Sequence, residues 1–192
     1  CKLKTHGMMA MSANIKNMFG VIPGTMKPEY HFRFPKHTDF ADMLIDLNTC
    51  LKPVLYLTDA IVGMEGNGPT SGTPRHIGAL LASQDPYGLD LLCAHLIGLS
   101  PEQVPTIVAA AERGLGSMAL SDLQIIGDPA PYVVPDYQNI TKPDSIEFSS
   151  VVPQFALPFV RRILKARPVP EKNTCIGCEK CREICPAKAI HM

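Results

Sequence analysis

Four cysteines within eleven residues constrain this chain more than any other feature of its sequence. They are spaced as Cys175-x-x-Cys178-x-x-Cys181-x-x-x-Cys185, and a proline follows directly. This is the spacing of the bacterial ferredoxin run that holds a 4Fe-4S cluster. Two-residue gaps let a tight loop present three thiolates to one face of the cluster, and Gly177 supplies the backbone freedom that such a loop needs. The motif predicts an iron–sulfur centre with these four cysteines as its metal ligands.

Zinc is the alternative metal for a loop so rich in cysteine. Structural zinc sites usually pair two Cys-x2–4-Cys knuckles that lie a dozen or more residues apart, and this chain has no such second knuckle. The other three of its seven cysteines are scattered, at Cys1, Cys50 and Cys93. An odd number with one tight cluster argues against a secreted disulfide framework. The pattern therefore favours iron–sulfur over zinc, and a cytoplasmic location.

The identity of the fourth ligand has two interpretations. In two-cluster ferredoxins the fourth cysteine of each run ligates the other cluster, and this sequence contains no second run. Either one cluster is held by all four cysteines, or Cys185 belongs to a truncated module whose longer parent protein holds a second cluster. Residues 170–192 are too few to fold without their cluster.

The rest of the chain alternates strand-like and helix-like segments. This predicts an α/β fold, a mostly parallel sheet with helices on its faces, over residues 1–168, followed by a small ferredoxin-like (α+β) segment over residues 169–192. Asp85 and Thr38 are expected to cap the helices that follow them. The expected strands are 1–4, 54–59, 77–82 and 123–126, the expected helices are 8–19, 39–51, 86–97 and 101–113, and residues 25–36 and 63–72 are expected to be loops.

Charge and hydropathy exclude two classes of partner. Eighteen Lys and Arg residues balance eighteen Asp and Glu residues, so the chain lacks the basic excess of a dedicated nucleic-acid binder. Charged residues and prolines interrupt every apolar run well short of the ~18 residues that a membrane span needs. We expect neither nucleic-acid binding nor a transmembrane helix.

A second candidate site lies where two expected strands end. Lys4 and His6 end the first strand just before a predicted helix, and such positions attract anionic ligands. Asp59 and Glu65 bracket the end of the second strand, where carboxylates can bind Mg²⁺ or act as acid and base. The four side chains predict a catalytic cleft for an anionic small molecule, although each residue alone also has a plain structural explanation in a turn or cap.

Several segments resemble one known family. Together with the ferredoxin run they resemble the middle of the iron–sulfur proteins of the "domain of unknown function 362" family. Members are typically longer at the N-terminus and often carry two ferredoxin runs, so the resemblance implies a fragment that lacks both. The family's reaction is not established, so the resemblance implies architecture and cofactor. The segments are Lys2-Leu3-Lys4-Thr5-His6, Asn14-x-x-Asn17-x-Phe19-Gly20-x-x-Pro23-Gly24, Asp59-x-x-x-Gly63-x-Glu65-Gly66-Asn67-Gly68-Pro69 and Ser83-x-Asp85-Pro86-x-x-x-Asp90.

These segments also contain four candidates for ligand binding. They are Asn14, Asn17, Asn67 and Gly68, of which the last two lie in a glycine-rich loop that could offer backbone N–H groups to an anion.

Three functions remain open at this stage. The first is electron transfer, with the cluster serving a redox partner protein that docks by electrostatic attraction to the basic stretch 161–167. The second is an oxidoreductase acting on an anionic small molecule in the Lys4, His6, Asp59 and Glu65 cleft. The third is a ligand-binding protein whose cluster is purely structural.

Overall fold

The computed structural model describes residues 1–140 and 175–184 of the chain. The chain divides into two compact units, Cys1–Ser145 and Ile146–Met192, each of which is considered by itself. The predicted domain boundary at residue 168 lies outside the described residues. In the part of the chain that is described, no helix is both long and apolar enough to cross a bilayer.

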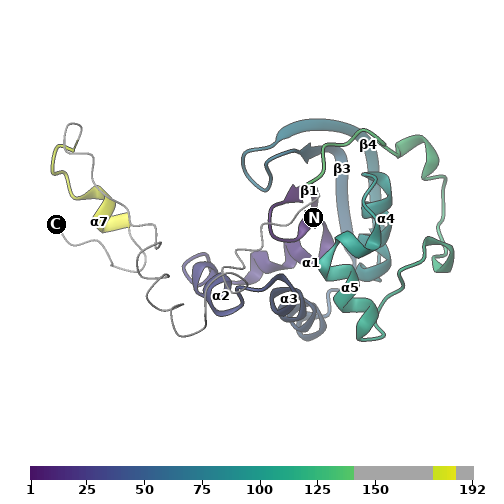
Figure 1. The fold of residues 1–192 in the computed structure, drawn as a ribbon, viewed down its shortest axis with the longest axis horizontal. Coiled ribbons are helices and arrows are strands. Elements are labelled where there is room, and N and C mark those ends of the chain that lie inside the picture. The colour runs from purple at the N-terminus through teal and green to yellow at the C-terminus, as the bar shows by residue number, and fades with distance from the viewer. Residues whose placement is uncertain (141–174, 185–192) are drawn as a thin grey trace, which may run out of the picture. The chain divides into compact units, whose positions relative to one another are not determined.

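The first unit is built on a four-stranded mixed sheet (Figure 1). Its order is β2 (Ala10–Ser12), β1 (Lys2–His6), β3 (Tyr56–Glu65) and β4 (Thr73–Ser83). Only β1 and β3 pair in parallel, whereas β1–β2 and β3–β4 are antiparallel. The expectation of a mostly parallel sheet is therefore wrong. The connections over residues 7–9 and 66–72 are too short for a crossover and allow only antiparallel pairing.

Five helices of the first unit lie between and after these strands. The long helices α3 (His37–Leu51) and α4 (Pro86–Leu96) confirm the predicted helices at 39–51 and 86–97. Asp85 caps α4 as expected, because its carboxylate accepts hydrogen bonds from the N–H groups of Tyr87 and Gly88. Thr38 does not cap α3, which begins one residue earlier, at His37. The helices are α1 (Asn14–Asn17), α2 (Lys27–Arg33), α3 (His37–Leu51), α4 (Pro86–Leu96) and α5 (Pro105–Glu112), with 3-10 turns η1 (Met18–Val21), η2 (Pro101–Gln103), η3 (Leu120–Asp122) and η4 (Ala130–Tyr132).

Besides the Thr38 cap, five local predictions are wrong. One is the loop expected over 63–72, because residues 63–65 belong to β3. The helix expected over 8–19 is replaced by β2 and α1, because Ala10 takes a left-handed φ of 59° that interrupts any helix there. The segment 25–36 contains α2, and the expected strand at 123–126 is irregular chain after η3. The helix expected at 101–113 is divided into η2 and α5, since Pro105 opens a new helix.

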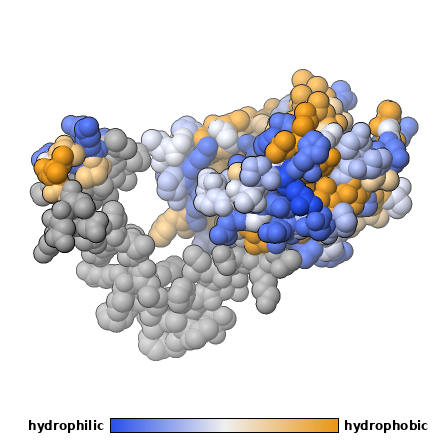
Figure 2. All heavy atoms as spheres, turned by 90° about the horizontal axis from the view of Figure 1, so that it is seen from above, coloured by the Kyte–Doolittle hydropathy of each residue, from blue (hydrophilic) through white to orange (hydrophobic). Residues whose placement is uncertain are grey.

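Two apolar cores hold the first unit together. One lies between the sheet and α4 and includes Leu3, Ala60 and Leu91. The other lies among α1, α3 and α5 and includes Ile15 and Phe40. The helices cover one face of β3 and β4 (Figure 1). Apolar side chains are also exposed on these strands, including Leu57 and Leu80, and apolar patches lie among hydrophilic ones in Figure 2.

A buried polar network joins α1, β3 and α4. One carboxylate oxygen of Asp90 accepts hydrogen bonds from the backbone N–H and the side-chain amide of Asn14, at 2.6 and 3.0 Å. The other accepts from Ile15 N–H at 3.4 Å. Thr58 completes the network by donating to the Asn14 amide oxygen at 2.7 Å. Asn14 and Thr58 are fully buried and Asp90 nearly so, and burial raises the pKa of Asp90 to about 6 despite these three donors.

The Asp90 carboxyl should make stability fall as the pH rises. A carboxyl whose pKa is raised on folding binds its proton more tightly in the native state. Its contribution is therefore complete below the unfolded pKa of 3.8 and is lost as the pH passes about 6. Relative to Asp90→Asn, the wild-type free energy of unfolding should fall by about 3 kcal/mol across this interval. Urea unfolding of both proteins between pH 4 and 7 measures the difference, and a difference independent of pH would refute it.

Candidate functional site

The described part of the cysteine run is an exposed loop followed by one short helix. Cys175 and Cys178 lie in the loop, and Cys181 lies in α7 (Lys180–Ile184). All three are exposed free thiols. Gly177 and Glu179 have left-handed φ angles of 68° and 56°, so the backbone changes direction at both residues between Cys175 and α7.

Glu179 fixes the start of α7. Its carbonyl accepts hydrogen bonds from the N–H groups of Arg182 and Glu183, at 2.9 and 3.1 Å. Its carboxylate also pairs with the Arg182 guanidinium at 2.8 Å. These contacts hold a non-glycine residue in a conformation that L-residues rarely adopt.

The donor set of this segment fits an iron–sulfur cluster. Thiolates are the soft ligands that such clusters use, and these three are neither paired in disulfides nor packed in a core. Among the described residues, no three His, Cys, Asp or Glu side chains already converge as a metal site. A segment this short is expected to fold together with its cluster, as in other small metal-dependent folds. Cys185, the fourth predicted ligand, lies outside the described residues.

Lys4 and His6 of the predicted cleft lie close together on β1. The Lys4 ammonium donates to the Pro69 carbonyl at 3.3 Å. His6 is buried, and its Nδ1 accepts hydrogen bonds from the N–H groups of Met8 and Met9 at 3.1 and 3.2 Å. Burial, followed by the positive charge of Lys16, lowers the pKa of His6 to about 3. His6 is therefore neutral at physiological pH, with its proton on Nε2.

The two acidic residues of the predicted cleft have other partners. Asp59 is exposed and pairs with Lys2 at 2.9 Å, and this hydrogen bond lowers the pKa of its carboxyl. Glu65 is buried, accepts from Gln138 N–H at 3.1 Å and lies 3.9 Å from the Arg75 guanidinium. The structure thus brings Lys4 and His6 together, and it engages Asp59 and Glu65 in separate contacts.

The two predicted asparagine ligands of α1 have structural contacts. Asn14 belongs to the buried network, where its side-chain amide donates to Asp90 and its amide oxygen accepts from Thr58. Asn17 donates from its side-chain amide to the Lys2 carbonyl at 2.8 Å. Both contacts fix α1 against neighbouring elements.

The glycine-rich loop packs tightly against β1. A Cβ atom at Gly68 would lie 2.1 Å from the Thr5 carbonyl oxygen, so only glycine fits there. The N–H groups of Gly66, Gly68 and Ser71 already donate to backbone carbonyls, and Asn67 is exposed. These three N–H groups are therefore not free to bind an anion.

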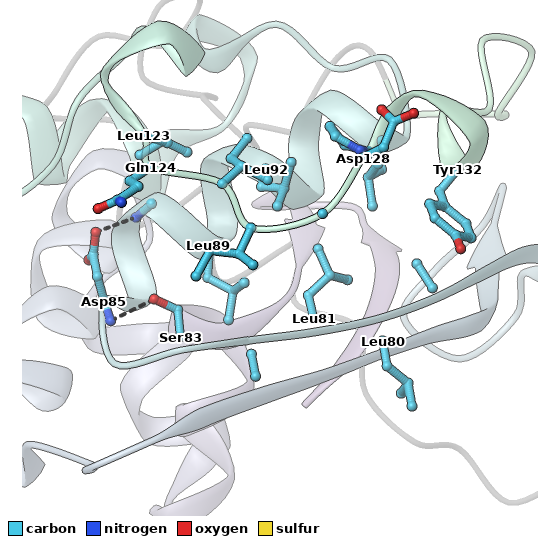
Figure 3. Close-up of a pocket in the computed structure, with 18 of the residues that line it drawn as sticks. Leu80, Leu81, Ser83, Asp85, Leu89, Leu92, Leu123, Gln124, Asp128 and Tyr132 are labelled. Atoms are coloured by element: carbon cyan, nitrogen blue, oxygen red, sulfur yellow. Dashed lines mark hydrogen bonds between the residues drawn. The ribbon is translucent and has the colours of Figure 1, made fainter.

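One cavity of the described residues was not expected from the sequence. It has a volume of about 810 Å³ and lies between β4, α4 and residues 122–132 (Figure 3). Its lining includes the apolar side chains of Leu81, Leu89 and Leu123 and the carboxylates of Asp85 and Asp128. None of the predicted cleft residues lines it.

Lys16 is a second feature that sequence reasoning missed. It is only 9% exposed although it is a lysine on a helix of four residues. The signal available in the sequence was weak, because a lysine within the helix expected over 8–19 would ordinarily face solvent.

Two family models match separate segments of the chain. Residues 1–95 match the family model described as "Domain of unknown function (DUF362)", and residues 168–191 match the "4Fe-4S binding domain". The chain is 35% identical over 138 residues to the thylakoid-associated protein sll1697 of Synechocystis sp.. That alignment covers 71% of this chain but only 43% of the relative, so the chain spans less than half of the relative's length. No solved structure matches.

The environment of His6 predicts an imidazole that stays neutral in mild acid. With a pKa of about 3 instead of 6.5, it should remain unprotonated at pH 5. Its contribution to stability is complete above pH 6.5 and is lost as the pH falls toward 3, because protonation breaks the hydrogen bonds to Nδ1. Imidazole ¹⁵N NMR from pH 7.5 to 5 measures this directly. A His6 ring that titrates near pH 6.5 would contradict the prediction.

Proposed function

Because this chain belongs to the DUF362 family and carries a 4Fe-4S binding domain, we propose that it is an electron-transfer protein. The observation that carries the proposal is the exposure of Cys175, Cys178 and Cys181. A cluster bound by exposed cysteines is accessible to another protein, whereas a purely structural cluster is better protected in a core. The cluster would accept one electron from a donor and release one to an acceptor, so no atoms are transferred.

The residues of this chain would hold the cluster and adjust its potential. Four thiolates, Cys175, Cys178, Cys181 and Cys185, are the proposed ligands. The cluster itself supplies the one-electron chemistry. Backbone N–H groups near a bound sulfur and exposure to solvent both affect the potential of such a centre.

The redox partner is proposed to carry an acidic surface. The stretch 161–167 contains four basic residues and no acidic one, and it immediately precedes the 4Fe-4S binding domain. Complementary charges would accelerate docking and make the rate fall with ionic strength.

The alternative of an oxidoreductase in the predicted cleft has weaker support. It requires Asp59 and Glu65 near Lys4 and His6, but Asp59 pairs with Lys2 and Glu65 contacts Arg75. Whether a longer parent protein is an enzyme is a separate matter, because the chain spans 43% of its relative.

Loss of one loop cysteine should abolish the cluster, whereas loss of a remote cysteine should not. We expect anaerobically reconstituted wild-type chain to hold about four irons and four sulfides and to give a paramagnetic cluster signal after reduction with dithionite. Cys178→Ala should lose most of the iron and the signal. Cys50→Ala is the matched control, because Cys50 is an exposed cysteine of α3 in the other unit.

Two results would count against the proposal. Equal iron loss in both variants would show that the iron is bound non-specifically. A full complement of iron that dithionite cannot reduce would indicate a structural cluster and remove the electron-transfer role.

A further inference from the structure

Five basic side chains from three elements gather around one end of β1. They are Lys4 and His6 of β1, Lys16 of α1, and Lys27 and His31 of α2, and we call this set the basic cluster. The positive charge of Lys16 acts on both histidines, and the charges of Lys4 and Lys27 act on Lys16. Among residues 1–140 and 175–184, no carboxylate contributes to the pKa shifts of His6, Lys16 or His31.

Lys16 is the centre of the basic cluster. It is 9% exposed, and its ammonium makes no hydrogen bond or ion pair with any residue of the described ranges 1–140 and 175–184. Charged groups are seldom buried unless they are paired, because desolvation costs far more than packing returns. The Nζ atom is not among the fully buried side-chain atoms of the described residues that lack a hydrogen-bond partner, so it keeps some contact with solvent and a small anion can reach it.

Aromatic rings form the apolar wall beside this ammonium. The Lys16 Nζ atom lies 4.8 Å from the ring centre of Phe19 and 5.6 Å from that of Phe40. Lys27 lies over the same Phe19 ring at 5.9 Å, and His31 stacks on Phe40 at 4.5 Å. These contacts place three basic groups around one pair of rings. The attraction between the cations and the rings partly offsets the desolvation cost of burying the charge.

His6 adds a neutral donor to the basic cluster. Its Nδ1 accepts from two backbone N–H groups, so its proton resides on Nε2. The structure records no hydrogen bond from Nε2 to any described residue, so this N–H remains available to a ligand.

From this arrangement we propose that the basic cluster binds a small oxyanion, the phosphate, sulfate-like or carboxylate group of a small molecule. Lys16 would be the buried counter-charge, Lys4 and Lys27 would add positive charge, and the His6 Nε2–H would donate to a ligand oxygen. A compact group suits the site, because Lys16 is only 9% exposed and little of its side chain can be contacted from the surface.

The pKa shifts of Lys16 and His31 agree with this geometry. Burial and the charges of Lys27 and Lys4 lower the pKa of Lys16 to about 8, and burial also lowers the pKa of His31. A bound anion reverses the charge repulsion and raises both values. Binding at pH 8 should therefore take up about half a proton from the buffer, mostly onto Lys16.

Titration of the full chain, reconstituted with its cluster, with sodium sulfate tests the proposal. Sulfate does not itself titrate near pH 8, and sodium chloride keeps the ionic strength constant. We expect saturable heat of binding in calorimetry, with proton uptake that appears as a difference between two buffers of different ionisation enthalpy. Lys16→Met should weaken sulfate binding by about tenfold or more and abolish the proton uptake.

Stability distinguishes a binding lysine from a structural one. Because Lys16→Met removes a buried, repelled charge but keeps most of the side-chain length, it should raise the thermal midpoint of the sulfate-free protein by a few degrees. Lys2→Met is the matched control, since Lys2 is an exposed cation of β1 that pairs with Asp59, and it should leave sulfate binding unchanged.

Two outcomes would overturn the proposal. One is a linear, non-saturating stabilisation by sulfate that is the same in wild type and Lys16→Met, since that is the general effect of an excluded salt. The other is a lower thermal midpoint in Lys16→Met with unchanged sulfate affinity, which would make Lys16 a packing residue. Neither outcome involves the iron content, so the electron-transfer proposal is tested separately.

Discussion

The buried carboxylate of Asp90 holds the first unit in its arrangement. It binds the backbone and side chain of Asn14, so it fixes α1, a helix of four residues that is far too short to persist alone. Lys16 belongs to α1, and Phe19 follows directly in η1. One network within the core therefore positions the ammonium and the ring on which the basic cluster depends. The network carries an energetic cost, because burial disfavours the charged form of the Asp90 carboxyl.

The cysteine run depends on metal–thiolate bonds where the first unit depends on a buried core. Its three described cysteines are exposed, and the short helix α7 follows a loop with two left-handed residues. So few residues cannot bury a core of their own, and metal–thiolate bonds supply what packing does not. Packing fixes the charged side chains of the first unit, whereas we expect the ferredoxin-type segment to fold together with its cofactor.

The sequence predicted features that are encoded locally and missed those that depend on distant contacts. Cysteine spacing identified the cofactor, and Asp85 before a proline located the start of α4. Gly63 made the end of β3 look like a loop, but it pairs with Arg75 of β4 within the strand. A larger residue there would meet the side chains of Tyr137 and Ile77. The burial of Lys16 arises from rings in η1 and α3 that no periodicity of α1 indicates.

The central claim, that this chain moves electrons through its cluster, is tested most directly by a potentiometric titration of the reconstituted full chain followed by EPR. The account predicts one reversible one-electron transition at a potential within the range of about −700 to +450 mV that such clusters span. The same curve should be obtained in the oxidative and reductive directions. Absence of any transition in this range, or loss of iron during the first reduction, would contradict the account.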